Sequence, residues 1–272
     1  MTSNVEYEYK NPLVKNARRI PAYLISVRDN YVSQYYANYS STYLQTYYKD
    51  KLKLLYYVKT DACSPETLHE FKERYPEVNL VKRERPVRNP SDKREWRDFS
   101  STEKSIWYSQ YDTWVKIARS GEKSIVLEHD VIPIQGRETD WDFAMQFDYF
   151  TFTAHERLGK LDEDGNPKFQ ISEIAGYVLS PELASWVVDH CKKSWNEESH
   201  CSFVNTDGAW AEIIRQAKKT GKFKIQSEEE GYTPGKVVGI KDFSEHVSCK
   251  QKKVFLIGTT IDHPRIYRQG DQ

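Results

Sequence analysis

Residues 124–133 have the sequence SIVLEHDVIP, and this stretch decides the predicted fold. The short apolar run 125–127 predicts a buried strand, which puts Glu128 and Asp130 at its carboxyl end. Open α/β sheets bind their ligands at that end of the strands. Side chains two residues apart on a strand point the same way, so the two carboxylates can share one divalent cation. The stretch therefore predicts a Mn²⁺ or Mg²⁺ site; two solvated acids at a strand end are the alternative.

The size and charge of the chain limit its class only loosely. Its 272 residues suffice for one large domain or two small ones with a proper core. The 40 Lys and Arg balance 40 Asp and Glu, so the net charge of +0 does not demand nucleic-acid binding. The 19 Tyr suit surfaces that stack on sugars, bases or peptides, but they suit an ordinary core as well.

The sequence carries no sign of export or membrane insertion. Residues 1–16 are polar and lack the apolar segment of a secretory signal, and no window approaches the length of a membrane span. The four cysteines have no framework spacing, which favours reduced thiols. We therefore expect a cytoplasmic protein without a transmembrane segment, in the host cytoplasm if it is viral. The oligomeric state stays open.

Strand and helix signals alternate along the first half of the chain, which predicts an α/β fold with a largely parallel sheet. We expect strands at 20–27, 53–58, 78–81, 125–127, 147–153 and 174–180. We expect a helix that ends near residue 48, and others over about 64–75, 101–119, 181–191 and 207–219. Pro65 after a serine is a good helix start, and Gly121 is a good helix end.

Residues 82–98 are predicted to form a polar loop. The segment has seven Lys or Arg against four Asp or Glu, two prolines and no periodicity. With Trp96 it could close over a donor as a lid, or contact a polyanionic acceptor, since arginine and tryptophan suit phosphate and base. A solvated loop whose charges pair with one another is the interpretation that we favour.

Other candidate site residues lie at the ends of predicted elements. Ser26, Arg28 and Asp29 form the corner after the first strand, where such a sheet would hold a nucleotide; a surface turn is the alternative. Asp61 follows the second strand and joins the predicted nucleotide site. Asp207 heads a helix, either as an N-cap carboxylate or as the group that deprotonates an acceptor hydroxyl.

The histidines near these acids are less informative. His129 lies between the two acids, so its side chain should face the other way, and it is left unassigned. His246 and His263 lie in the late, loop-like part of the chain. His246 is taken as the third metal ligand, with plain surface as the alternative.

The order of these parts resembles that of glycosyltransferase family 25 and its GT-A-fold relatives. Residues 101–114, STEKSIWYSQYDTW, lead through Gly-Glu-Lys to the strand and its acids. In that family a helix with a Ser-His pair and a Trp precedes a Leu-Glu-Asp-Asp-Val metal motif. Residues 175–181, AGYVLSP, resemble the family's Ala-Tyr-Leu-Ile-Ser segment, and residues 205–207, NTD, its Pro-x-Asp. This chain departs at His129 and at Gln110, where the family has an acid and a histidine.

The resemblance covers about residues 20–215 and implies a GT-A-like (Rossmann-like) fold, a mostly parallel sheet flanked by helices. The expected organisation is an extension over 1–19, one transferase domain over 20–245 with an irregular end, and a tail over 246–272 packed on it. The implied activity moves a sugar from a nucleotide-sugar, often a UDP-sugar, to a hydroxyl with Mn²⁺ or Mg²⁺. Glu128 and Asp130 would hold the ion.

The remaining roles follow the same resemblance. Arg28 and Asp29 would help hold the nucleotide, and Tyr177 is placed with the donor-binding residues. Asp207 would face the acceptor or the anomeric carbon.

The acceptor divides the hypotheses. A saccharide is the family's common case, and hydroxymethylated bases of DNA, modified by a phage-type enzyme, are the runner-up because the segment 82–98 is basic. Such an enzyme would extrude its target base. A non-catalytic nucleotide-sugar-binding or scaffold protein on this fold is the third reading, which His129 in place of an acid allows.

Overall fold

The structure is a computed structural model of the whole chain. It describes residues 19–27, 31–59, 65–80, 82–84, 96–129, 132–133, 141–161, 167–170, 174, 176–199, 202, 204–226, 253–255 and 257–258.

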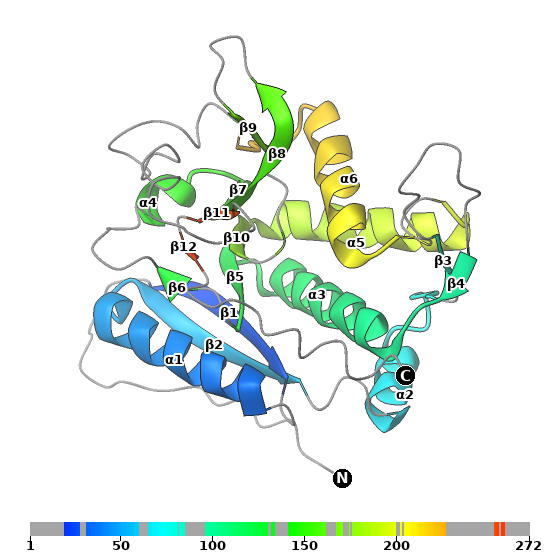
Figure 1. The fold of residues 1–272 in the computed structure, drawn as a ribbon, viewed down its shortest axis with the longest axis horizontal. Coiled ribbons are helices and arrows are strands. Elements are labelled where there is room, and N and C mark those ends of the chain that lie inside the picture. Colours follow the sequence, from blue (N-terminus) through cyan, green and yellow to red (C-terminus); the bar gives the residue numbers. More distant parts are fainter. Residues whose placement is uncertain are drawn as a thin grey trace.

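A five-stranded mixed sheet forms the centre of the molecule (Figure 1). Its strands, in spatial order, are β2 (Leu52–Lys59), β1 (Ile20–Val27), β5 (Ser124–Glu128), β10 (Gly176–Leu179) and β7 (Tyr149–Thr151). Strand β1 pairs in parallel with β2 and β5, whereas β10 is antiparallel to both β5 and β7. The α/β prediction is confirmed, but the prediction of a mostly parallel sheet is wrong. A short apolar run has the same pattern in either direction, and the connection that inserts β10 between β5 and β7 sets its direction.

Helices cover both faces of this sheet. On one face α1 (Tyr31–Tyr48) and the short α4 (Trp141–Ala144) pack against Leu24 and Leu127. On the other face α2 (Pro65–Arg74), α3 (Ser101–Ser120), α5 (Pro181–Asn196) and α6 (Thr206–Lys219) share one core with Ile25 and Val126. Neighbouring strand residues thus point into different cores, as the pleat requires. Within the described ranges, no helix combines the length and the apolar character needed to cross a membrane.

Two predictions about the region between α2 and α3 are wrong. Residues 78–80 form no strand. Val78 and Leu80 are buried while Asn79 is exposed, so the burial of these side chains alternates although the three residues belong to no sheet. The predicted loop over 82–98 has paired ends, because β3 (Lys82–Glu84) and β4 (Trp96–Asp98) form an antiparallel ladder. Burial against helices can produce the same alternation, with a period of two, that is typical of a strand in a sheet.

Short strands add two smaller sheets beside the centre. Strands β8 (Thr153–Leu161), β9 (Pro167–Gln170) and β11 (Lys253–Phe255) form a three-stranded sheet, in which β8 is central. Strands β6 (Ile132–Pro133) and β12 (Ile257–Gly258) pair with each other. The described parts of residues 246–272 therefore hydrogen-bond to strands that follow β5 and β7 in the sequence.

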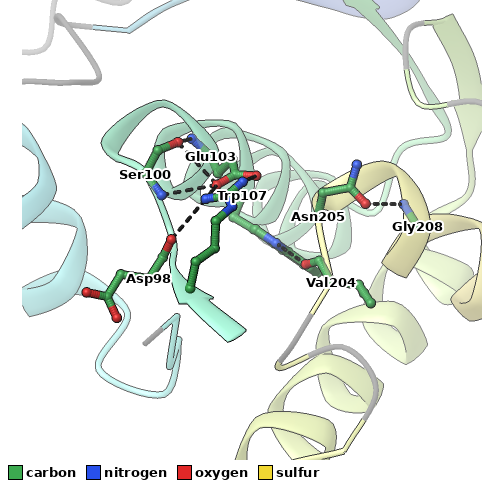
Figure 2. Close-up of polar contacts among 8 residues, drawn as sticks. Asp98, Ser100, Glu103, Trp107, Val204, Asn205 and Gly208 are labelled. Atoms are coloured by element: carbon green, nitrogen blue, oxygen red, sulfur yellow. Dashed lines mark hydrogen bonds and ion pairs between the residues drawn. The ribbon is translucent and has the colours of Figure 1, made fainter. Parts of the chain in front are cut away.

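Helix α3 begins at a capping box, as its sequence allows. The Ser100 side chain accepts from the backbone N–H of Glu103 at 3.2 Å, and the Glu103 carboxylate accepts from the backbone N–H of Ser100 at 3.0 Å (Figure 2). The Arg97 guanidinium donates to both oxygens of the same carboxylate, at 2.8 and 2.7 Å. Gly121 ends the helix with φ 67, a left-handed conformation that glycine adopts without strain. Both predicted ends of this helix are confirmed.

The capping box should contribute measurably to stability. We expect Ser100→Ala to lower the free energy of unfolding by about 1 kcal/mol, because one backbone N–H at the helix start loses its acceptor. Urea denaturation monitored by circular dichroism measures the change. Ser101→Ala, at the next and exposed position, is the matched control and should stay within about 0.5 kcal/mol of the wild type. Equal effects of the two substitutions would contradict this role of Ser100.

Candidate functional site

The candidate site lies at the carboxyl edge of the sheet. Strands β1, β2 and β5 are parallel, so they end at the same edge. Val27 pairs with Lys59 there, and Ile25 pairs with Glu128. Helix α3 precedes β5 through a tight connection, so it runs back across the sheet with its first turns toward this edge. Strand β10, which is antiparallel, begins at it.

Five of the predicted site residues lie outside the described residues. They are Arg28, Asp29, Asp61, Asp130 and His246. Ser26, Glu128, Tyr177 and Asp207 are described, and they come from β1, β5, β10 and α6.

The Glu128 carboxylate is half-buried at the end of β5, on the face that α3 covers. It follows Val126 by two positions, and Val126 lies in the α3 core. It is also close enough to Tyr177 to affect that phenol. Burial, above all, raises the pKa of Tyr177 well above its usual range, and the Tyr149 and Glu128 charges add to the rise. Glu128 and Tyr177 are therefore electrostatic neighbours on one side of the sheet.

His129 lies on the opposite side of β5, as the alternation of the strand predicts. Its ring is stacked near that of Tyr36 on α1, with centroids 6.5 Å apart and planes at 17°. Its backbone carbonyl accepts a hydrogen bond of 2.8 Å from the Ser40 hydroxyl, also on α1. His129 thus contacts α1, and it does not share a side with Glu128.

A buried hydrogen-bonded network lies on the same side of the sheet as Glu128. The Tyr177 hydroxyl accepts from the Trp114 indole N–H at 2.8 Å and donates to the Gln110 side-chain carbonyl at 2.8 Å. All three side chains are at most 1% exposed. Because its hydroxyl already has both partners, Tyr177 is placed to support the sheet edge from inside the core. It is not placed to contact a donor directly.

Gln110 and Trp114 are buried neighbours of Tyr177 that the sequence does not predict. In the sequence, Gln110 is noted only as a departure from a Ser-His pair, and Trp114 only as the last residue of the segment 101–114 that resembles the family's helix. A polar residue in the middle of a buried helical stripe was the available signal, because it must find a partner in the core. That partner is Tyr177, 67 positions away in the sequence.

Ser26 lies near the end of β1, on the face that α1 covers. Its side chain is 1% exposed, and its hydroxyl makes no hydrogen bond within the described part of the molecule. Leaving a buried hydroxyl without a partner is unfavourable, so such groups are uncommon in folded proteins. Its place at the sheet edge, next to the predicted nucleotide corner, suits a hydroxyl that a ligand would satisfy.

Asp207 lies in the first turn of α6 and is exposed. The N-cap of this helix is Asn205, whose side chain accepts from the Gly208 N–H at 3.2 Å, so the N-cap alternative for Asp207 is wrong (Figure 2). The Trp107 indole N–H donates to the Val204 carbonyl at 3.1 Å and ties the start of α6 to α3. Asp207 is therefore carried on the same face of the sheet as Glu128.

The chemistry of the site is that of oxygen ligands. Carboxylate oxygens are the ligands that Mg²⁺ and Mn²⁺ prefer, so Glu128 fits the predicted ion. No group of three His, Cys, Asp or Glu suited to a metal occurs among the residues that the structure describes, where Glu128 is the one member of the predicted set.

No family model matches this chain. A search of curated proteins likewise finds no match. The function proposed for this protein therefore rests on the geometry of the site and on the sequence motifs.

The buried network predicts a stability effect at Tyr177. We expect Tyr177→Phe to lower the free energy of unfolding by about 1–3 kcal/mol, because the Trp114 N–H and the Gln110 carbonyl lose their partner inside the core. Chemical denaturation of the purified variant measures the loss. Tyr35→Phe removes the same hydroxyl from a side chain that is 65% exposed, and it should change stability by less than about 0.5 kcal/mol. A Tyr177 variant as stable as this control would show that the network contributes nothing.

Proposed function

We propose that this protein is a metal-dependent glycosyltransferase that moves a sugar from a nucleotide-sugar, in our proposal a UDP-sugar, to an acceptor hydroxyl. The observation that carries the proposal is the half-buried Glu128 carboxylate at the end of β5. It combines an acidic group, a central strand and the sheet edge at which α/β folds bind ligands. The sequence supplies a second acid, Asp130, two positions later.

The proposed roles assign each predicted residue to one part of the reaction. Glu128 and Asp130, with His246, would hold Mn²⁺ or Mg²⁺. The bound ion would neutralise the charge that develops on the diphosphate leaving group. Ser26, Arg28, Asp29 and Asp61 would hold the nucleotide, with the arginine on phosphate. Asp207 would accept the proton of the acceptor hydroxyl.

A saccharide is the acceptor that we favour over DNA. The DNA hypothesis depends on the basic segment 82–98, and Arg97 in that segment is already paired with both oxygens of Glu103. Such a pair is mutually neutralised and offers little to a phosphate backbone. Duplex DNA that binds with a steep salt dependence would reverse this preference, whereas no binding at low salt would remove the DNA hypothesis.

Calorimetry with Mn²⁺ and UDP tests the proposal. We expect micromolar UDP binding that requires Mn²⁺. Glu128→Gln should weaken this binding by at least about tenfold, since loss of an outer-sphere partner of a metal alone lowers metal affinity by that factor. Glu122→Gln is the matched control, because Glu122 is also half-buried but precedes the opposite end of β5. It should leave UDP affinity unchanged.

Three other outcomes separate the alternatives. UDP binding that is equal with and without Mn²⁺ would contradict the metal site. Equal weakening by both glutamine substitutions would contradict the specific place of Glu128. Metal-dependent binding of UDP-sugars without hydrolysis or transfer of any of them would favour the non-catalytic binding protein.

A further inference from the structure

Helix α1 exposes a surface without charge. None of its 18 residues is Asp, Glu, Lys or Arg, although these residues make up 29% of the chain. Exposed helix faces normally carry charged side chains, which keep them soluble. An outer face that lacks them over the full length of a helix therefore calls for a reason other than solubility.

Tyrosines line the outer face of this helix at every fourth position. We call Tyr35, Tyr39, Tyr43 and Tyr47 the tyrosine stripe. Three of these side chains, those of Tyr35, Tyr39 and Tyr47, are 65%, 51% and 66% exposed, while Tyr43 is half-buried and its ring centroid lies 4.5 Å from that of Tyr47. Four residues advance a helix by about 6 Å and turn it by about 40°, so the rings follow one another along the helix on a shallow spiral.

The inner face of α1 explains why the stripe faces outward. Ala37 and Leu44 are buried in the core beneath the helix, and Ser40 is buried and bonded to the β5 end. Burial of that face fixes the rotation of the helix, so the tyrosines cannot turn inward. Figure 1 shows α1 on the outside of the sheet, in front of β1 and β2.

The chemistry of the stripe matches a neutral sugar chain. Phenol rings stack on the C–H faces of sugar rings, and their hydroxyls accept and donate hydrogen bonds. The exposed residues between them, Asn38, Thr42 and Thr46, are polar and uncharged. A surface without cations does not attract phosphates or sulfates, which argues against nucleic acids and anionic lipids.

The stripe is continuous with the candidate site. The Tyr35 and Tyr36 rings lie edge to face, with centroids 5.4 Å apart, and Tyr36 lies against His129, which directly follows Glu128. Because α1 follows β1 in the chain, its first turn is at the carboxyl edge, and its last turn is at the opposite edge. The stripe therefore leads from the metal-binding edge across the outside of the sheet.

We propose that the tyrosine stripe binds a neutral polysaccharide, extended along α1, with one end at the carboxyl edge of the sheet. This inference deepens the proposed transferase function, since it names the acceptor as a neutral glycan polymer. Its binding step, however, requires neither the cation nor the nucleotide. A second copy of this chain is the competing occupant, because tyrosine is common at protein interfaces.

Affinity electrophoresis in gels that contain dextran, yeast mannan or galactomannan tests the stripe. We expect at least one of these neutral polysaccharides to retard the protein. The double variant Tyr39→Ala/Tyr47→Ala should bind it at least about tenfold more weakly, since two stacked rings are lost. Alanine is the best helix former, so these substitutions leave α1 intact, and circular dichroism verifies this. Trp96→Ala is the matched control, because Trp96 is an aromatic residue with 50% exposure on β4.

Five results would overturn the inference. The first four are no retardation by any of the three polysaccharides, equal retardation of the wild type and the double variant, weakening by Trp96→Ala to the same extent, and stripe-dependent retention by heparin, a polyanion. A concentration-dependent dimer that light scattering detects for the wild type but not for the double variant would assign the stripe to a second copy, and it would also overturn the inference.

Calorimetry separates this inference from the transferase proposal. The double variant should bind UDP and Mn²⁺ as the wild type does, because the stripe lies outside the predicted nucleotide site. Glu128→Gln should be retarded by the polysaccharide as the wild type is. A wild type that binds the polysaccharide but not UDP would refute only the nucleotide-sugar proposal. A wild type that binds UDP but no polysaccharide would refute only the proposed role of the tyrosine stripe.

Discussion

The Tyr177 hydroxyl is the group on which the arrangement around α3 depends. It is the one atom that both the Trp114 indole and the Gln110 amide use, and all three groups are buried. A core tolerates such a polar set only when each member has a partner. A slip of α3 by one residue would turn Gln110 and Trp114 away from β10 and leave three polar groups unsatisfied. The network therefore selects one register of α3 on the sheet, where apolar packing alone would allow several.

Other parts of the molecule take their position from this register. Trp114 also stacks on Trp210 of α6, with centroids 4.9 Å apart and planes at 20°. Trp107, on the same helix, holds the carbonyl of Val204 just before α6. The place of Asp207 thus follows from two tryptophans of α3. The same helix lies over the face of β5 that carries Glu128, so the two described acids of the proposed reaction are positioned by one element.

The parts that the sequence predicts well are those whose signals are local. Strand β5 has a short, uninterrupted apolar run, which is typical of a buried strand. Helix α3 has a serine, a glutamate and a glycine at the positions where a helix begins and ends. The parts that it predicts badly depend on distant partners. The direction of β10 follows from where the chain returns to the sheet, and the buried alternation of Val78 and Leu80 reports contact with helices.

The candidate site shows the same division between local and distant information. The opposite orientations of Glu128 and His129 follow from strand alternation, and they are predicted. The partner of Gln110 and the outward orientation of the tyrosine stripe on α1 are not predicted. The four-residue spacing of Tyr35, Tyr39, Tyr43 and Tyr47 is visible in the sequence, but a tyrosine row can equally face a core. Only the burial of Ala37 and Leu44 on the other side of α1 decides that it faces solvent.

The end of β5 joins two different environments through adjacent residues. Glu128 faces the α3 side, with its buried polar network, and His129 faces the α1 side, against Tyr36 and next to the tyrosine stripe. The transferase that we propose would need such a junction, because its residues come from both faces. Ser26, on the α1 side, would hold the nucleotide, while Glu128 and Asp207, on the α3 side, would bind the ion and face the acceptor. A single strand end provides such a junction at low cost, since successive side chains of a strand point to opposite faces. With a histidine at position 129, the strand end brings no carboxylate to the uncharged outer face of α1, along which the proposed polysaccharide would lie.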